Sequence, residues 1–228
     1  MTNSKTPLSI VMIGATGAVG GHAVQKLLTL PEVGRITLLG RRPVADISDA
    51  RVEQHKIDIF TPASYDSLLA GHTTAVCTLG VGEPSKMNRE DFVKIDKTAV
   101  LDFATACKKA GVRHFELLAS VGISSSSASF YLRIKGELVD ELQALNFERL
   151  SIFQPSMILT PTNRYGFSQA LTLAVWPWLK PLLIGGLRKY RGIPVAQLGG
   201  AIGANVATNK SGVERLTWDD FVRLCPKK

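Results

Sequence analysis

Three evenly spaced glycines near the start of the chain constrain its fold most. Residues 8–13 (LSIVMI) are typical of a buried strand, and residues 18–30 have the apolar spacing of an amphipathic helix. Between them, Gly14 permits a sharp turn, Gly17 lets the backbone approach a pyrophosphate, and Gly20 lets the helix pack on the strand. The helix N-terminus adds free N–H groups and a dipole that favours anions. A purely structural glycine turn is the alternative.

This turn therefore predicts a dinucleotide-binding site. The residues expected to contact the ligand there are Gly14, Ala15, Thr16, Gly17, Ala18, Val19 and Gly20.

Short apolar segments alternate with longer amphipathic ones along most of the chain. Strands are predicted at 8–13, 35–39, 52–57, 74–79, 112–119 and 149–153, and helices at 18–30, 62–70, 88–109 and 130–145. This alternation predicts an α/β fold with a doubly wound parallel sheet of the Rossmann type. Residues 1–160 would form this core, and residues 161–228 a small C-terminal cap packed on the same domain.

The 228 residues suit one domain, and their net charge of +8 is unevenly placed. From residue 161 onward ten lysines and arginines face three acids, and no acid lies between Glu148 and Glu214. No nucleic-acid motif accompanies this basic stretch, so no nucleic-acid partner is expected. A solvated basic face, attraction of an anionic ligand and contact with a membrane surface remain open.

Three cysteines without CxxC spacing argue against a disulfide framework or a metal site. The start of the chain lacks a secretory signal, and the apolar segment 165–179 is too short to span a membrane, so we expect a cytoplasmic location. We further expect a monomer or a homodimer. Trp176 and Trp178 belong to an apolar cluster beside Lys180. This cluster could be a packed cap helix, an apolar substrate mouth or a peripheral membrane contact.

Two arginines, Arg41 and Arg42, follow the second predicted strand. NAD-binding chains usually carry an acid there, on the ribose hydroxyls. An acid would repel a 2′-phosphate, whereas a guanidinium can bind it through two charge-assisted hydrogen bonds. The pair therefore favours NADP(H), with two solvated surface arginines as the alternative.

Further cofactor contacts are expected where the third and fourth strands end. Asp58 would accept a hydrogen bond from the adenine amino group, and Ile59 would cover the ring. The stretch passing under the cofactor would be Thr78, Leu79 and Gly80.

Tyr131 and Lys135 are four residues apart and share one face of a predicted helix. An ammonium group close to a phenol lowers the phenol's pKa, so Tyr131 could exchange a proton with a carbonyl or alcohol oxygen. Ser120, at the end of the fifth strand, could hold that oxygen, and Lys135 could also bind the nicotinamide ribose. Surface residues on an ordinary helix are the alternative.

Several stretches resemble the short-chain dehydrogenase/reductase superfamily, of the atypical or extended kind. The closest similarity is to its Tat-interacting-protein-like branch of NADPH-binding oxidoreductases. The matching stretches are VMIGATGAVGG, ITLLGRR, CTLG, EDFVKID, RHFELLAS, YLRIKGELVDEL and SIFQPSMIL, between about residues 8 and 159. The resemblance implies a Rossmann fold, bound NADP(H) and a Ser120–Tyr131–Lys135 triad.

The resemblance also implies further contacts of the cofactor. Asp96 and the residues 118–120 would lie near it, and the nicotinamide side would be lined by Pro155, Ser156 and Met157. Related proteins often have Arg-Pro-Gly after the sixth strand, where this chain has Gln154, Pro155 and Ser156.

The leading hypothesis is an NADPH-dependent oxidoreductase acting on a small carbonyl or alcohol substrate, with an apolar substrate as one option. A non-catalytic NADPH-binding regulator or scaffold is the first alternative. A nucleotide-sugar epimerase or dehydratase is the second, because it shares the active-site chemistry. The intact Tyr131–Lys135 pair favours an enzyme, because a cofactor sensor does not require it.

Overall fold

The first strand, β1 (Leu8–Ile13), is buried on both of its faces. The computed structural model describes residues 7–81, 87–160 and 183–226. Ile10 and Met12 pack in one buried cluster, whereas Val11 and Ile13 pack in another. This burial on both sides is typical of a parallel sheet covered by helices on each face.

A parallel sheet of seven strands runs through the described part of the chain, in the order β3-β2-β1-β4-β5-β6-β9. The strands after β1 are β2 (Val33–Gly40), β3 (Val52–Lys56), β4 (Thr74–Cys77), β5 (His114–Leu118), β6 (Arg149–Phe153) and β9 (Gly212–Leu216). The chain moves outward from β1 to β3, then returns to the other side of β1 to form β4. Ligands of open α/β sheets bind where the strand order reverses in this way, so β1 and β4 frame the expected site.

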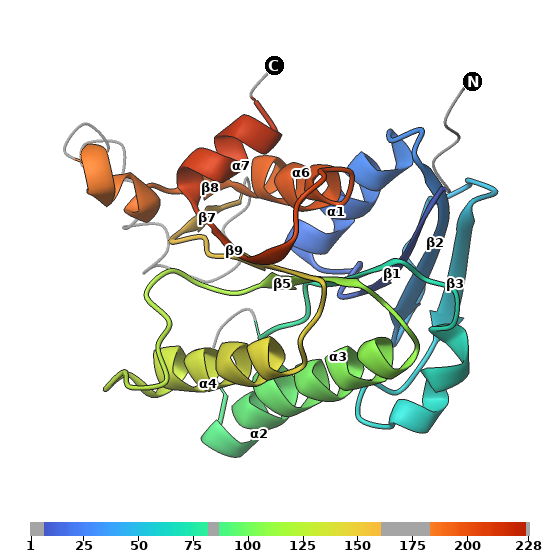
Figure 1. Ribbon diagram of the computed structural model, residues 1–228, viewed down its shortest axis with the longest axis horizontal. Helices are drawn as coiled ribbons and strands as arrows, with labels where there is room; N and C mark the ends of the chain where they lie inside the picture. Colours follow the sequence, from blue (N-terminus) through green and yellow to red (C-terminus); the bar gives the residue numbers. More distant parts are fainter. Residues whose placement is uncertain (1–6, 82–86, 161–182, 227–228) are drawn as a thin grey trace.

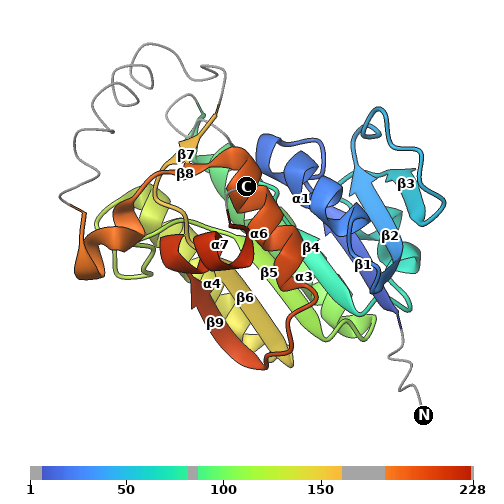
Figure 2. The same ribbon diagram turned by 90° about the horizontal axis from the view of Figure 1, so that it is seen from above.

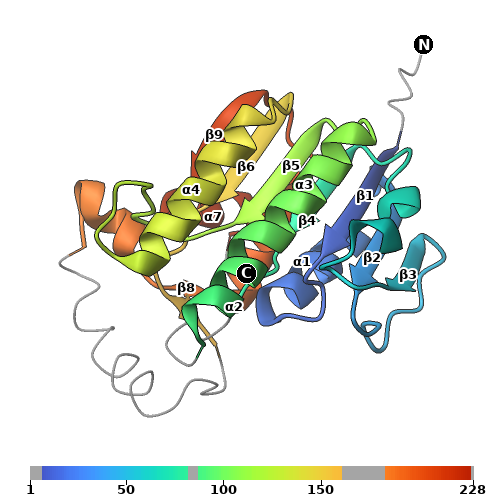
Figure 3. The same cartoon turned by 90° about the horizontal axis from the view of Figure 1, so that it is seen from below.

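Helices cover both faces of the sheet (Figure 1). On one face lie α1 (Ala18–Leu28), α6 (Val195–Asn205) and α7 (Trp218–Leu224), as Figure 2 shows from above. On the other lie α2 (Arg89–Val93), α3 (Ala99–Lys109) and α4 (Phe130–Ala144), as Figure 3 shows from below. The Rossmann-like fold and the six predicted strands are confirmed. The short helix predicted at 62–70 is instead a pair of 3-10 turns, Pro62–Ser64 and Asp66–Leu68.

The C-terminal segment contributes more to the core than the predicted cap would. β9 extends the central sheet beside β6, and α6 packs directly on α1. Gly199 and Gly203 make this approach possible, because an added Cβ would lie 2.5 Å from the Val19 carbonyl oxygen and 2.7 Å from that of Ala23, respectively. These residues therefore belong to the same folded unit as the first 160.

Smaller elements complete the described C-terminal part. β7 (Ile158–Leu159) pairs with β8 (Ile193–Pro194), and a 3-10 helix covers Gly185–Tyr190. The apolar cluster around Trp176 and Trp178 lies outside the described residues. Within the described ranges, no helix has the length and apolar character needed to cross a membrane.

The helix predicted at 88–109 contains a wide turn. A π-helical segment, Lys94–Thr98, separates α2 from α3. The apolar pattern predicts Ile95 on the inner stripe, but Ile95 is half-buried and Asp96 is 1% exposed. Because a π-turn holds one more residue per hydrogen-bonded ring than an α-turn, it shifts which side chains face inward. The wide turn thus accompanies a carboxylate on the inner face.

Candidate functional site

The glycine turn has the geometry that its sequence predicts. Gly14 has φ +87°, and an added Cβ would lie 2.6 Å from Thr78 Oγ1, just after β4. The Gly17 N–H donates to the Gly14 carbonyl oxygen at 2.9 Å. A Cβ on Gly20 would collide with that same oxygen. Gly14 and Gly20 therefore bring β1, α1 and the end of β4 into contact.

The start of α1 suits a phosphate. Its N-cap is Gly17, which has no side chain with which to cap the helix, and the first turn has no acid. Thr16 and Gly17 are exposed, whereas the Val19 side chain is buried in the core and offers a ligand only its backbone. Free N–H groups and the helix dipole thus point to open space, which fits a pyrophosphate.

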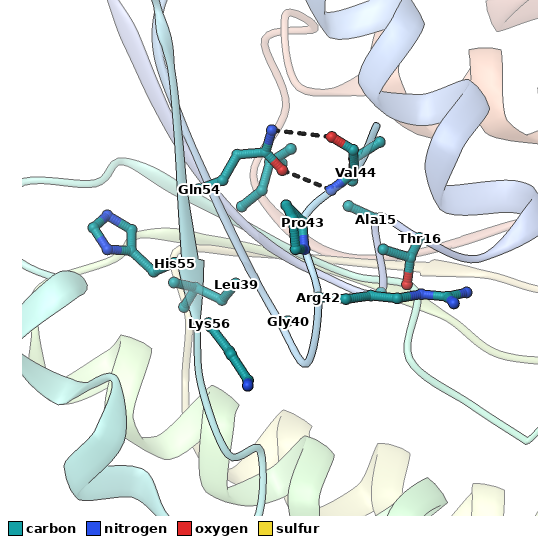
Figure 4. A pocket seen from close by; sticks show the side chains of 12 residues that line it. Ala15, Thr16, Leu39, Gly40, Arg42, Pro43, Val44, Gln54, His55 and Lys56 are labelled. Carbon is teal, nitrogen blue, oxygen red and sulfur yellow. Dashed lines mark hydrogen bonds between the residues drawn. The ribbon is translucent and has the colours of Figure 1, made fainter. Parts of the chain in front are cut away.

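A pocket of about 200 Å³ adjoins this turn (Figure 4). It is lined by Gly14, Ala15, Thr16, Leu38, Leu39, Gly40, Arg42, Pro43, Val44, Gln54, His55 and Lys56. The lining contains no carboxylate. Arg42 belongs to it, and its side chain extends toward the turn at Thr16 in Figure 4. Arg41 is exposed beside the pocket and is not part of its lining.

Asp58 and Ile59, expected at the adenine, lie outside this lining. The Asp58 carboxylate accepts hydrogen bonds from Phe60 N–H and Thr61 Oγ1, both at 3.0 Å. These bonds, first the one from the Phe60 backbone, lower the pKa of Asp58. Ile59 packs in the core. The proposed adenine contacts of both residues stay predictions.

Lys135 is buried and forms an ion pair at the carboxyl edge of the sheet. Its Nζ lies 2.6 Å from Asp96 Oδ1, and the two side chains are 5% and 2% exposed. Asp96 Oδ2 accepts a hydrogen bond from Val81 N–H at 2.8 Å, which ties the loop after β4 to the same pair. Burial lowers the pKa of Lys135, but the Asp96 carboxylate and Tyr131 outweigh it, so that the pKa stands above its usual value. Lys135 is therefore held as an ammonium.

Gly80 brings the loop after β4 close to this ion pair. An added Cβ there would lie 3.2 Å from Asp96 Oδ1 and 3.8 Å from Lys135 Nζ. The predicted cofactor stretch at the end of β4 thus meets the predicted catalytic lysine.

Tyr131 lies in the first turn of α4, half-buried. Its ring packs on Phe92 with 5.6 Å between centroids, and Phe92 also contacts Phe130 at 5.9 Å. This aromatic contact fixes the orientation of the phenol from the α2 side. Tyr131 and Lys135 share one face of α4, as their spacing predicts.

Ser120 follows β5 and is attached to the end of β6. The residues on either side of it donate backbone hydrogen bonds, Ala119 N–H to Phe153 O at 2.8 Å and Val121 N–H to Pro155 O at 3.0 Å. Ser120 is half-buried, and among the described residues its hydroxyl makes one contact, a long one of 3.5 Å with the Val121 carbonyl oxygen. Ser120 and Pro155 thus lie together at the carboxyl edge.

Ser156 and Met157 continue from Pro155 at this edge and are half-buried. The Met157 carbonyl oxygen accepts a hydrogen bond from Ile193 N–H at 2.9 Å, which joins this stretch to β8. Their expected position beside the nicotinamide stays a prediction.

Sequence reasoning missed Gln54 and Lys56 as pocket residues. The available signal was the position of Lys56 at the end of a strand that pairs with the strand before Arg41. The Asp96–Lys135 ion pair was also missed, although the resemblance placed Asp96 near the cofactor. A carboxylate at an expected helix surface gave no signal by itself.

Comparisons with known proteins agree with this geometry. A family model described as NAD(P)H-binding matches residues 14–148, more than half of the chain. Protein HTATIP2 of Rattus norvegicus is 33% identical over 153 residues, covering 66% of this chain and 63% of that protein. The mitochondrial protein fmp52 of Aspergillus clavatus is 31% identical over 159 residues, covering 66% of each. The chain thus spans just under two thirds of the length of these relatives.

Solved structures share the fold at lower identity. MoeE5 in complex with UDP-glucuronic acid and NAD superposes with a TM-score of 0.69 at 16% identity, over 91% of this chain and 75% of that one. A UDP-N-acetylglucosamine 4-epimerase from Methanobrevibacter ruminantium gives 0.68 at 14% identity, over 93% and 77%. With a matching family model that contains both the glycine turn and the Tyr131–Lys135 helix, the chain belongs to the NAD(P)H-binding family.

Proposed function

We propose that the protein is an NADPH-dependent oxidoreductase of the short-chain dehydrogenase/reductase type that interconverts a carbonyl compound and its alcohol. The observation that carries this proposal is the buried Lys135 ammonium, one helical turn from Tyr131 and next to Gly80 at the end of β4. This arrangement places a positive charge and a phenol at the edge of the sheet where the glycine turn would hold a dinucleotide.

In the reductive direction, a nicotinamide held at this edge of the sheet would supply a hydride, with its two electrons, to the carbonyl carbon. Tyr131 donates its phenolic proton to the carbonyl oxygen, so that C=O becomes CH–OH and a phenolate remains, which regains a proton from water. Lys135 stabilises that phenolate, and Ser120 Oγ donates a hydrogen bond to the substrate oxygen. The reverse sequence oxidises an alcohol.

The walls beside Tyr131 favour a small substrate with an apolar part. Phe92 is 2% exposed and packs beneath the half-buried rings of Phe130 and Tyr131, so that of these three rings Phe130 and Tyr131 offer aromatic surface to a ligand. Arg89 and Arg133 lie over the Phe130 ring, 5.0 Å and 5.8 Å from its centroid. Packing on this surface would orient the carbonyl toward Tyr131 and Ser120.

The preference for NADPH is supported by Arg42 in the pocket lining and by the lack of a carboxylate there. Replacing Arg41 and Arg42 together with alanine should weaken NADPH binding much more than NADH binding, because only NADPH carries the 2′-phosphate. Dissociation constants for both cofactors measure this. Equal losses would contradict the preference.

Turnover of NADPH with a panel of aldehydes and ketones tests the reaction. Tyr131→Phe should lower kcat about 100-fold or more while NADPH affinity changes less than about twofold, because a proton donor is lost and the packing on Phe92 is kept. Tyr190→Phe is the matched control and should retain wild-type turnover, since Tyr190 lies in the 3-10 helix Gly185–Tyr190. Full activity in Tyr131→Phe would reject the proposed role.

A non-catalytic NADPH-binding regulator is the second candidate. The observation that favours it is the Asp96 carboxylate, which neutralises Lys135 and so weakens its effect on a Tyr131 phenolate. Tight NADPH binding by the wild type, without turnover of any carbonyl in the panel, would support the regulator and reject the enzyme.

For localisation we propose a reducing compartment, with the cytoplasm as the first choice. Cys77, Cys107 and Cys225 are free thiols, and the first two are buried. The fmp52 proteins among the relatives are described as mitochondrial. Cell fractionation with an antibody against the protein would decide between these compartments.

A further inference from the structure

The last residue of β3, Lys56, lies against a glycine at the edge of the sheet. Lys56 pairs in register with Gly40, the last residue of β2, and Ile57 N–H donates to the Gly40 carbonyl oxygen at 3.0 Å. Because Gly40 has no side chain, nothing from its own position covers the Lys56 stem. Figure 4 shows the Lys56 side chain running past the turn at Gly40. Lys56 therefore lines the pocket from β3 and Arg42 lines it from the stretch after β2, with their side chains on opposite sides of the turn at Gly40 in Figure 4.

A second residue of β3 fixes the chain that carries Arg42. Gln54 Oε1 accepts from Val44 N–H at 2.7 Å, and Gln54 Nε2 donates to the Val44 carbonyl oxygen at 3.1 Å. These two bonds, drawn in Figure 4, hold the stretch after β2 on β3. Arg42 and Lys56 are thus placed from two strands that are tied together at this end.

The charge of the pocket is not compensated within it. In the described part of the chain, neither Arg42 nor Lys56 has an ion-pair partner. Two nearby carboxylates are already engaged: Glu53 with Arg35 at 3.0 Å, and Asp49 with Arg51 at 2.8 Å. Two cations at one pocket without a carboxylate in its lining form a site for an anion of high charge.

We propose that Lys56 is a specificity-determining residue that binds the 2′-phosphate of NADP(H) opposite Arg42, an inference that rests on the proposed function. The planar guanidinium gives directed hydrogen bonds, and the flexible ammonium supplies a second positive charge that a phosphate dianion can use and a ribose hydroxyl cannot. Lys56 thereby raises the preference for NADPH over NADH beyond what the arginines give.

Binding measurements with Lys56→Gln test this without any substrate. The dissociation constant for NADPH should rise about 5- to 10-fold, the effect of losing one exposed charge pair to a dianion. The constant for NADH should stay within about twofold. Adenosine 2′,5′-bisphosphate and 5′-AMP, as smaller probes, should reproduce the same contrast. Lys56→Arg should retain most of the NADPH affinity.

Lys109→Gln is the matched control, because it removes one exposed lysine charge in the last turn of α3, on the other face of the sheet. It should leave both constants unchanged, and the thermal midpoint of Lys56→Gln should equal that of the wild type. An unchanged NADPH constant in Lys56→Gln, or equal losses for NADPH and NADH, overturns the assignment.

The outcomes separate this inference from the proposed function. If Lys56→Gln is silent while the Arg41/Arg42 double variant selectively loses NADPH, Lys56 is rejected and the cofactor preference stands. If the wild type binds NADH as tightly as NADPH, the cofactor preference fails and the role of Lys56 fails with it.

Discussion

Two ion pairs with a buried cation have the same length and different surroundings in this protein. Lys135 and Asp96 lie 2.6 Å apart near the carboxyl edge of the sheet, and Arg149 and Glu214 lie 2.6 Å apart near the amino ends of β6 and β9. Arg149 also donates to Asn205 Oδ1 and Thr208 Oγ1, at 2.9 Å and 2.7 Å, and to two backbone carbonyl oxygens. In the described ranges, the one ion-pair partner of Lys135 is Asp96.

This difference separates a structural charge from one available to a ligand. A guanidinium with partners for all of its nitrogens can gain nothing from a new contact. An ammonium has three donors, so Lys135 keeps bonding capacity at the site while Asp96 compensates its charge. Arg149 therefore holds β6, β9 and the end of α6 together, and Lys135 can respond to what binds.

The largest expected effect is the loss of the structural pair. Arg149→Ala should lower the free energy of unfolding by about 3–5 kcal/mol, because Glu214 Oε1, Asn205 Oδ1 and Thr208 Oγ1 all lose the buried guanidinium that donates to them, even though Lys210 still pairs with Glu214 Oε2. Urea unfolding measures this. Arg215→Ala is the control, since exposed Arg215 makes one hydrogen bond to Gln143 at 3.1 Å, and it should cost less than about 1 kcal/mol. A loss of less than about 1 kcal/mol in Arg149→Ala would contradict the structural role of the Arg149–Glu214 pair.

A smaller effect is expected at the site. Asp96→Asn should lower the free energy of unfolding by about 2–3 kcal/mol, less than Arg149→Ala because water or a ligand can reach the uncompensated ammonium. Adding Lys135→Met should restore much of this loss, since the buried charge is removed. The denaturation midpoints of the single and double variants, with and without NADPH, measure the coupling.

The matched control for Asp96→Asn is a substitution of the next residue, Lys97. Lys97 lies in the same wide turn and bridges Glu137 at 2.8 Å and Glu141 at 2.9 Å, but its side chain is 21% exposed. Lys97→Ala should cost less than about 1 kcal/mol, as a partly exposed pair does. If Lys97→Ala lowered the free energy of unfolding more than Asp96→Asn does, burial would not explain how much these two ion pairs contribute to stability.

The change expected over a single pH unit is smaller, at most about 1.4 kcal/mol, and it concerns the cluster around Arg149. Burial raises the pKa of Glu116 to about 8, although its Oε1 accepts from Asn205 Nδ2 at 2.9 Å. His114 beside it stays neutral, because burial lowers its pKa to about 3. Glu214 faces the same cluster, where burial opposes ionisation but its bonds to Ser151, Lys210 and Arg149 lower the pKa to about 2.

Between pH 4.5 and pH 8 the folded chain therefore keeps a proton on Glu116 that the unfolded chain has released. The contribution of this group to stability is complete below pH 4.5 and is lost as the pH rises through 8, by up to about 1.4 kcal/mol per pH unit. Glu116→Gln should remove this slope in urea unfolding between pH 5 and pH 8. Parallel pH curves for wild type and variant would reject the shifted pKa.

Local patterns were sufficient to predict the first six strands, of which all but the polar β3 (VEQHK) are mainly apolar stretches bounded by turn residues. β9 escaped prediction because Glu214 and Arg215 interrupt it, and it is a strand only through its pairing with β6. α6 was not predicted because its sequence, VAQLGGAIGAN, is rich in glycine, which disfavours helices. Two of those glycines are needed for the approach to α1, a demand that no local pattern shows.

The site, like the fold, has some features that local sequence predicts and others that depend on contacts between distant segments. The glycine turn and the Tyr131–Lys135 spacing are local signals, and the sequence alone predicts both. The pairing of Lys135 with Asp96 depends on the wide turn between α2 and α3, and the entry of Lys56 into the pocket depends on strand register. Both join residues from different elements, so they become visible only in the folded chain.

Because of the wide turn at Lys94–Thr98, the position of the Asp96 carboxylate depends on the number of residues in this segment. In a regular α-helix each residue advances the chain by about 100°, so a chain shortened by one residue in this segment would rotate the preceding side chains by that angle relative to α3. Such a deletion would leave every functional group in the sequence and yet separate Asp96 from Lys135. In this region, insertions and deletions would therefore alter the chemistry more readily than many substitutions would.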